Sequence, residues 1–550
     1  MNQYRFHQEM HYKSDWEGDY NSKLVTAEEA VKVVKSGDYV VTPLPVQAML
    51  LERTLCTRKD ELRDVTIVTS NPVADPGWFS PGMEESFTPV ITLFIGALTR
   101  AAHDAKRSTY LPSSFSKWFK TIDDDRPEKR DIDVFITPLS APDKNGFCYF
   151  GPHMWHKRSY AKRAKKVIAE VDPNIPKMYG DNAIHVTEID YFVENPSLRV
   201  PSEYMFKVLD IMELPSERRA TEVESLRRIV TPEMAERLIT PEVKEMLLNL
   251  PTISHERRLS SEEVLRRLYM RNPDMVGVVS STALPIIADP NVDLWVVARP
   301  LGVEDPTPES YGIAENLKQI IKDGDSFNIG VGRPSLYMVE LGVFDEKHDL
   351  GIYTEMGAPG MALLVKREIV TGKYRTFHPG KAIFSTLTGC GGEDIEFAAE
   401  NPTFELYDDE YVVDITNIAK VENMVAINNG LQVDFTGQIC SESQFGPRMI
   451  NGQGGQLEMH IGAFLAKGGR ACTLLPSTAF GGAVSTIVPQ LEKGSLVTIQ
   501  RHFADIVITE HGIARLAGKN HRERASELIG VAHPDFRAEL KKEAQKLFYP

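Results

Sequence analysis

Cysteine is scarce in this sequence, with 5 in 550 residues. The cysteines are widely spread and never form a C-x-x-C pair; they are Cys56, Cys148, Cys390, Cys440 and Cys472. An odd number of scattered cysteines argues against a disulfide framework and against a zinc site built from cysteine pairs. We therefore expect a protein of a reducing compartment.

Long apolar runs and an excess of positive charge are also missing. Residues 1–20 are polar, and the longest mildly apolar stretch, 275–288, is interrupted by serines and a proline. This pattern predicts a cytoplasmic protein without a signal peptide or a membrane-spanning helix. The net charge of −15 argues against a general nucleic-acid binder or a ligand of anionic membranes. Any anionic ligand must then be held by a local site.

The composition is that of a folded chain, too long for one core. Hydrophobic residues make up 42% and charged residues 25%, close to globular averages. Between residues 24 and 193, helical patterns separate short runs rich in β-branched residues. These runs, at 39–42, 65–69, 90–94, 134–137 and 167–170, predict an α/β domain with a parallel sheet. Thr26 is expected to cap a helix that begins at Ala27.

The middle of the chain has a different texture. Strand signals vanish between about 201 and 272, before a strand-like run at 275–300. Within this part, "TPEMAERLI" and "TPEVKEMLL" each combine a Thr cap with Pro at the first helical position. The alternation of strands and helices resumes near residue 308, with glycine beside many apolar runs. We therefore divide the chain into an α/β domain at 1–200, a mainly helical insertion and linker at 201–307, and a second α/β domain at 308–550.

Several familiar signatures fail. "GVGRPS", from Gly330, lacks the third glycine of a dinucleotide fingerprint, and "GIARLAGKN" has the wrong spacing for a P-loop. His153 and His156 have no further ligand at metal spacing, and Ser477 has no assigned base and no nucleophile elbow. We expect no metal site.

A glutamate in a glycine-rich setting remains. Glu355 in "GIYTEMGAPG" follows a strand-like run, which predicts a carboxylate at a turn beyond a strand and a possible nucleophile. Downstream, "MINGQGGQLEMHIGAF" offers consecutive small residues whose N–H groups could stabilise an oxyanion. On the residues alone, Glu442 in "CSESQFG" is an equal competitor.

At these residues the sequence resembles a known family. "INNGLQVDFTGQICSESQFGPRMINGQGGQLEMHIGAFLAKGGRACTLLPSTAFGGAVSTIVP" and the text that follows it look like the acetyl-CoA hydrolase/transferase family, and "DVFITPLSAPDKNGFCYFG" resembles its N-terminal domain. The resemblance implies two open α/β domains of the CoA-transferase type, with the helical insertion between them and the active site between the two domains. It also implies acyl-CoA and small carboxylates as substrates, no tightly bound cofactor, and a homodimer.

The resemblance also implies roles for individual residues. Glu355 matches the catalytic glutamate, and Glu442 loses its claim because relatives on the succinate branch lack a glutamate there. Asn417 and Gly455 match the side-chain and backbone donors to the thioester carbonyl, with Asn428 or Asn429 as alternatives to Asn417. The residues expected beside CoA are Gly330, Gly332, Pro334, Gly454, Lys467 and Arg470.

We therefore expect a CoA-transferase that uses acetyl-CoA as its default donor. Glu355 would form an anhydride with the acyl group and then a thioester with CoA. An acyl-CoA hydrolase with the same glutamate is the near alternative, and a non-catalytic acyl-CoA-binding protein is the alternative of another class.

Overall fold

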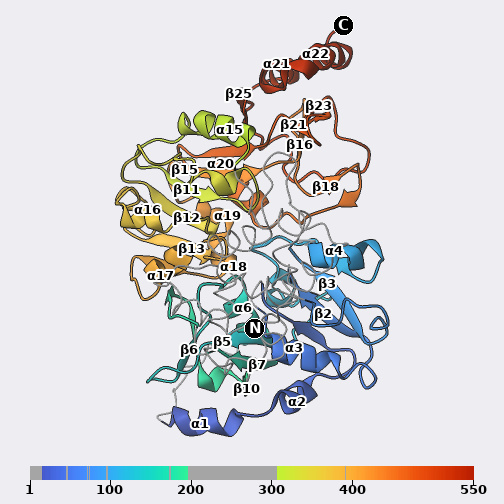
Figure 1. The fold of residues 1–550 in the computed structure, drawn as a ribbon, viewed down its shortest axis with the longest axis vertical. Helices are drawn as coiled ribbons and strands as arrows, with labels where there is room; N and C mark the ends of the chain where they lie inside the picture. The colour runs from blue at the N-terminus through green and yellow to red at the C-terminus, as the bar shows by residue number, and fades with distance from the viewer. Residues whose placement is uncertain are drawn as a thin grey trace, which may run out of the picture. The chain divides into compact units, whose positions relative to one another are not determined.

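The chain folds into two compact units (Figure 1). The computed structural model describes residues 15–44, 47–70, 72, 75–93, 97–172, 175–195, 306–390 and 392–550. Unit 1 contains the described residues of the N-terminal half, except that Leu93 and the segment Pro112–Trp118 belong to unit 2, with the chain from residue 305 onward. The insertion predicted over 201–307 lies outside the described residues apart from its last two.

Unit 1 is built on a seven-stranded sheet in which every neighbouring pair is parallel. In spatial order the strands are β10 (Tyr191–Glu194), β7 (Lys166–Val171), β5 (Val134–Leu139), β1 (Tyr39–Val41), β2 (Val65–Thr69), β3 (Phe87–Ile91) and β4 (Thr109–Tyr110). The helices are α1 (Trp16–Lys23), α2 (Ala27–Ala30), α3 (Met49–Cys56), α4 (Ala97–Asp104), α5 (Lys120–Asp123) and α6 (Lys157–Arg163). All six residues of β5 are buried, as expected for a central strand covered on both faces.

Local signals in unit 1 behave largely as predicted. The Thr26 hydroxyl accepts a hydrogen bond from the Glu29 N–H at 3.2 Å, and α2 begins at Ala27. The strand predicted at 90–94 instead runs from Phe87 to Ile91. Pro89 is tolerated inside the strand, because β4 is two residues long and pairs only with Val90 and Ile91.

Unit 2 has a second, mostly parallel sheet. Its strands lie in the order β25 (Gly512–Arg515), β24 (Ile506–Thr509), β20 (Arg470–Leu474), β15 (Met424–Asn429), β11 (Ser326–Ile329), β12 (Gly351–Met356), β13 (Ala382–Thr386) and β14 (Phe404–Leu406). β25 runs antiparallel to β24, and the other pairs are parallel. The parallel strands therefore end together at one edge, which we call the carboxyl edge.

Helices and short strands complete unit 2. The helices are α15 (Pro308–Lys318), α16 (Leu363–Lys366), α17 (Gly392–Ala398), α18 (Asp409–Val412), α19 (Ile415–Ile418), α20 (Gln456–Leu465), α21 (His521–Val531) and α22 (Pro534–Phe548). The short strands are β16 (Gln432–Asp434), β17 (Ile439–Cys440), β18 (Ser443–Gln444), β19 (Arg448–Met449), β21 (Thr478–Ala479), β22 (Val484–Ser485) and β23 (Ile487–Val488). α20 packs on α19, β15 and β20, which fixes the orientation of its first turn.

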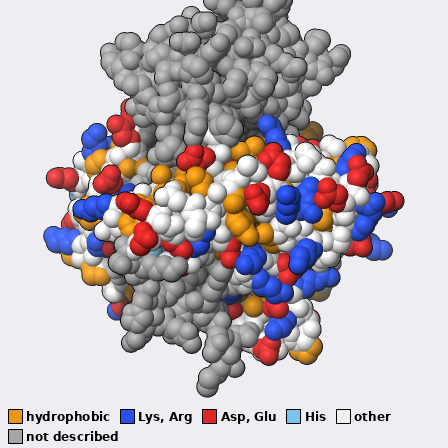
Figure 2. All heavy atoms as spheres, turned by 90° about the horizontal axis from the view of Figure 1, so that it is seen from below, with side chains coloured by type: hydrophobic (Ala, Val, Ile, Leu, Met, Phe, Trp, Pro, Cys, Tyr) orange, Lys and Arg blue, Asp and Glu red, His pale blue; other side chains and the backbone are white. Residues whose placement is uncertain are grey.

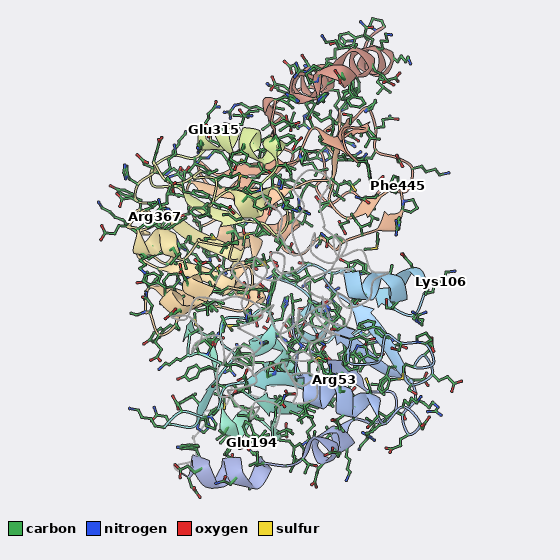
Figure 3. The ribbon with its side chains drawn as sticks, viewed as in Figure 1. Arg53, Lys106, Glu194, Glu315, Arg367 and Phe445 are labelled. Atoms are coloured by element: carbon green, nitrogen blue, oxygen red, sulfur yellow. The ribbon has the colours of Figure 1, made fainter. Side chains whose placement is uncertain are left out.

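The surface is mixed in charge. In Figure 3, Glu315 on α15 and Arg367 after α16 lie at the outside of unit 2, where they pair with Lys318 and Asp345. Figure 2 shows one face of the molecule, on which acidic and basic side chains are interspersed over the described surface. All five cysteines are described, and each is buried as a free thiol. Among the described residues, we find no helix with the length and hydropathy needed to span a bilayer.

Candidate functional site

Glu355 lies at the carboxyl edge of the sheet in unit 2. It is the penultimate residue of β12, and its side chain is 8% exposed. We expected it in a turn beyond the strand, but the ladder continues past it, because Met356 still pairs with Thr386 of β13. The strand therefore holds the backbone of Glu355, which makes its carboxylate a fixed group and not one carried by a loose loop.

Gly455 contacts this carboxylate. It is the N-cap residue of α20, and its N–H, one of the donors that a helix start leaves unpaired, donates to Glu355. A side chain at position 455 would overlap Glu355 Oε2. The absence of a side chain thus allows the carboxylate to reach the start of the helix, and two of the residues expected at the site lie together.

The environment of Glu355 disfavours its ionised form. Burial raises the pKa of Glu355 above its ordinary value, the charge of Glu458 raises it further, and the Gly455 N–H opposes both effects. A carboxylate that is costly to ionise is a strong nucleophile once it has lost its proton. This combination suits covalent chemistry better than a structural ion pair.

The three candidate asparagines differ in what their side chains already do. Asn417, on α19, donates to the Tyr411 carbonyl at 3.0 Å and accepts from Lys420 at 2.7 Å. Asn429 donates to the Val331 carbonyl at 2.7 Å and accepts from the Ser335 N–H. Asn428 is 3% exposed, and its Nδ2 has no hydrogen-bond partner among the described residues.

Asn428 also lies close to the expected CoA loop. It is the penultimate residue of β15 and the neighbour of Gly330, where a side chain would overlap its Oδ1. The Asn328 side chain links Asn428 to Thr354 of β12 by hydrogen bonds of 3.4 and 2.9 Å. The structure therefore places the free amide donor of Asn428 at the same edge as Glu355.

The loop from Gly330 to Pro334 follows β11 at that edge. Gly332 has φ +98°, a conformation that favours glycine. The Ser335 hydroxyl donates to the Gly330 carbonyl at 2.5 Å, and the Asn429 side chain donates to the Val331 carbonyl. Val331 remains 38% exposed. The loop is thus anchored at both ends and open between them.

Lys467 and Arg470 lie at the opposite edge. Arg470 is the first residue of β20, and its guanidinium forms an ion pair with the buried Asp325 and donates to the Ile320 carbonyl at 2.8 Å. Lys467 has an 82% exposed side chain and pairs with Glu422 at 3.1 Å. Because parallel strands share their amino ends, the structure does not bring these two cations to Glu355.

The other candidates occupy structural positions. The Glu442 carboxylate accepts from the Thr498 hydroxyl at 2.8 Å, and its carbonyl accepts from the Ile450 N–H. In unit 1, the His156 ring lies edge-on to Phe119 at 5.8 Å. Within the described ranges, no group of three or more His, Cys, Asp or Glu residues could hold a metal ion.

Glu458 is the neighbour that we did not predict. It lies in the first turn of α20 and raises the pKa of Glu355. The sequence contained a partial signal, because an acidic residue three positions after a glycine N-cap is common at helix starts. Nothing in the sequence connects that position to β12, which is about a hundred residues earlier in a parallel sheet.

Comparisons with known proteins identify the family of this chain. The N-terminal domain of the acetyl-CoA hydrolase/transferase family matches residues 7–202, and its C-terminal domain matches residues 393–544. A 4-hydroxybutyrate coenzyme A transferase from Clostridium kluyveri is 32% identical over 97% of this chain and 100% of its own length. A succinyl-CoA:cyclohexane-1-carboxylate CoA transferase from Geobacter metallireducens is 28% identical over 97% of this chain and 98% of its own.

A solved structure extends the match to three dimensions. The crystal structure of RipA from Yersinia pestis superimposes with a TM-score of 0.71 at 25% identity, covering 98% of this chain and 100% of that chain. The predicted α/β class is confirmed. With both family domains and a relative matched along its whole length, the chain belongs to the acetyl-CoA hydrolase/transferase family and is an enzyme of CoA transfer or hydrolysis.

Proposed function

We propose that the enzyme transfers CoA from an acyl-CoA to a small carboxylate through covalent intermediates on Glu355. The contact between the Glu355 carboxylate and the Gly455 N–H supports this proposal most strongly. It combines a buried nucleophile with a backbone donor at a helix start, the arrangement that acyl transfer requires. Acetyl-CoA is the proposed default donor.

The chemistry conserves the thioester energy. Ionised Glu355 attacks the acyl-CoA carbonyl carbon, CoA thiolate leaves, and a glutamyl–acyl anhydride remains. The thiolate then attacks the Glu355 carbonyl carbon, which releases the acyl group as its carboxylate and leaves a glutamyl-CoA thioester. An incoming carboxylate reverses these two steps and departs as the new acyl-CoA.

Two donors are proposed for the oxyanion. The Gly455 N–H faces Glu355 in the structure and would turn its hydrogen bond to the thioester oxygen when substrate binds. The side-chain donor expected from the family resemblance is Asn417. Asn428 is the alternative that the structure supports, because its Nδ2 is buried and unpaired among the described residues, whereas Asn417 donates to Tyr411.

The test is covalent capture on the intact protein. Incubation with acetyl-CoA, and in a separate sample with butyryl-CoA, should add a CoA group to the wild-type chain. Peptide mass analysis should locate this group at Glu355. Glu355→Gln should form no adduct and lose transfer activity. Glu442→Gln, which changes a second shielded glutamate, should keep both. An adduct that persists in Glu355→Gln would refute the proposal.

The same preparation separates transfer from hydrolysis. Under the proposal, the rate of acyl-CoA consumption depends on an added carboxylate acceptor such as acetate, succinate or butyrate. A rate independent of the acceptor would instead show a hydrolase. A homodimer and a cytoplasmic location, expected from the resemblance and the composition, complete the proposal; light scattering would test the first and cell fractionation the second.

A further inference from the structure

Glu458 is a second shielded carboxylate beside Glu355. It is the third residue of α20, three residues after Gly455, and it is 1% exposed. The helix therefore presents the Gly455 N–H to Glu355 from its cap and the Glu458 carboxylate from its first turn. The Gly455 position lies against the Glu355 carboxylate, and Glu458 lies within one turn of it on the same helix.

One oxygen of Glu458 is heavily hydrogen-bonded. Its Oε1 accepts from the Ser114 hydroxyl at 2.9 Å and from the Phe115 N–H at 2.6 Å. The Ser116 N–H also donates to this carboxylate. These donors belong to the segment Pro112–Trp118, which is part of unit 2. Burial raises the pKa of Glu458, and these donors oppose that effect by stabilising the ionised carboxylate.

The other oxygen of Glu458 differs from Oε1 in its hydrogen bonding. Oε2 is buried and makes no hydrogen bond to any described residue. Other charged groups belong to elements around β12. Asp409 and Glu410 lie on α18, which packs on β12. Arg375 donates a hydrogen bond to the Ile352 carbonyl of β12, and Lys117 and Asp414 form an ion pair. Among the described residues, Glu458 is the charged side chain whose repulsion raises the pKa of Glu355.

We propose that Glu458 is a positioning residue that acts through Glu355: its fixed negative charge destabilises the free, ionised nucleophile and thereby favours the neutral covalent intermediates. The inference rests on the proposed function, because it needs the glutamyl-CoA thioester to exist. It assigns to Glu458 an electrostatic role beyond anchoring the segment Pro112–Trp118 to α20.

The charge balance of the reaction explains the effect. Over the first half-reaction, the Glu355 carboxylate and an acyl-CoA become a Glu355–CoA thioester and a free acyl carboxylate. The negative charge of Glu355 leaves with the released acid, so the repulsion by Glu458 acts on the reactant and not on the thioester. Removing the Glu458 charge should therefore lower the equilibrium amount of thioester.

Two measurements must agree: the shift of the acidic limb in pH units and the change in the thioester equilibrium on a logarithmic scale. If the pKa of Glu355 falls by one unit in Glu458→Gln, the equilibrium constant for thioester formation should fall about tenfold at pH values above the pKa. The first measurement is the pH dependence of kcat/KM, whose acidic limb should move to lower pH in Glu458→Gln. The second is the ratio of CoA-bearing to free intact protein at a fixed ratio of acetyl-CoA to acetate, measured by mass.

Companion variants separate charge from structure. Glu458→Asp keeps the charge and should restore the acidic limb toward that of the wild type. Ser114→Ala removes one donor to Glu458 but keeps both carboxylates, so it should leave the acidic limb close to that of the wild type. Glu458→Ala also removes the charge and serves if Glu458→Gln does not fold. Thermal unfolding of each variant checks the fold.

The outcomes distinguish the two proposals. If wild-type enzyme forms no CoA adduct, the proposed function fails. If it does, and folded Glu458→Gln or Glu458→Ala shows a wild-type acidic limb and a wild-type ratio of CoA-bearing to free protein, Glu458 is merely structural and this inference is overturned. An acidic limb at lower pH together with a proportionately smaller ratio of CoA-bearing to free protein supports it.

Discussion

Replacing Gly455 with alanine should damage the reaction much more than the fold. The backbone at Gly455 has φ −86° and ψ 11°, which alanine can adopt. The added Cβ would lie 2.9 Å from Glu355 Cδ and 3.0 Å from Val413 Cγ1, whereas carbon atoms prefer about 3.5–4.0 Å. The Glu355 carboxylate must therefore withdraw by roughly 1 Å, because β12 holds its backbone.

The size of the effect follows from that displacement. A misplacement of about 1 Å at reacting atoms can cost on the order of 100-fold in rate, or about 2.7 kcal/mol. We expect kcat/KM for acetyl-CoA to fall by about that factor in Gly455→Ala, with a loss of about 1–3 kcal/mol in unfolding free energy from overpacking. Steady-state kinetics and urea unfolding measure the two quantities.

A control on the same helix isolates the cause. In Gly462→Ala the new Cβ would lie 2.5 Å from Ile418 Cβ, so it crowds α19 and not the nucleophile. It should destabilise the fold by a similar amount while folded protein keeps its kcat/KM. A folded Gly455→Ala enzyme with wild-type kcat/KM would refute the assignment of Gly455 and Glu355 as neighbours in the reaction.

Three further outcomes follow from other groups. Because burial and Glu458 raise the pKa of Glu355, kcat/KM should rise with pH along an acidic limb above the ordinary range of a glutamate; a flat profile from pH 5 to 9 would contradict this. In unit 1, burial raises the pKa of Glu52 to about 8 and that of Glu170 to about 7. The folded state then binds more protons than the unfolded state, and the unfolding free energy should fall as pH rises from about 5 to 8, by about 4 kcal/mol for Glu52 alone. Glu52→Gln should remove most of that slope in urea titrations at several pH values, and an unchanged slope would refute its source. Arg470→Gln should cost about 3–5 kcal/mol of stability by leaving Asp325 buried and unpaired, with an unchanged KM for acetyl-CoA; a raised KM in folded protein would instead place Arg470 beside CoA.

Much of the fold could be predicted from local sequence patterns. The Thr26 cap, the strands of unit 1 and the α/β class are set by short-range features such as capping, β-branched runs and burial, which neighbouring residues display. The shift of β3 to Phe87–Ile91 depends on which strand lies beside it, and that is a property of the sheet. Whether Pro89 can lie inside a strand depends on the neighbouring strand β4, which the sequence alone does not identify.

The candidate site was predictable in its parts but not in its connections. Glu355 was one of two glutamates singled out from their motifs, and the family resemblance selected it and Gly455; the contact between them depends on α20 packing against the sheet. Glu458 depends on Ser114 and Phe115, which lie more than three hundred positions earlier. Arg470 attracted attention as a cation near a glycine pair, whereas its buried partner Asp325 is 145 positions away.

Because unit 2 includes the segment Pro112–Trp118, dividing the chain at one point does not yield all of unit 2. This segment comes from the first half of the chain, yet Ser113 accepts a hydrogen bond from Gln453, and Lys117 pairs with Asp414. A polypeptide that began near residue 305 would lack this strap and leave the Glu458 carboxylate without its amide donors. A chimera that joins the C-terminal half of this chain to the N-terminal half of a relative should therefore also include these seven residues. Without them, the groups around Glu458 and Glu355 would come from the relative's sequence.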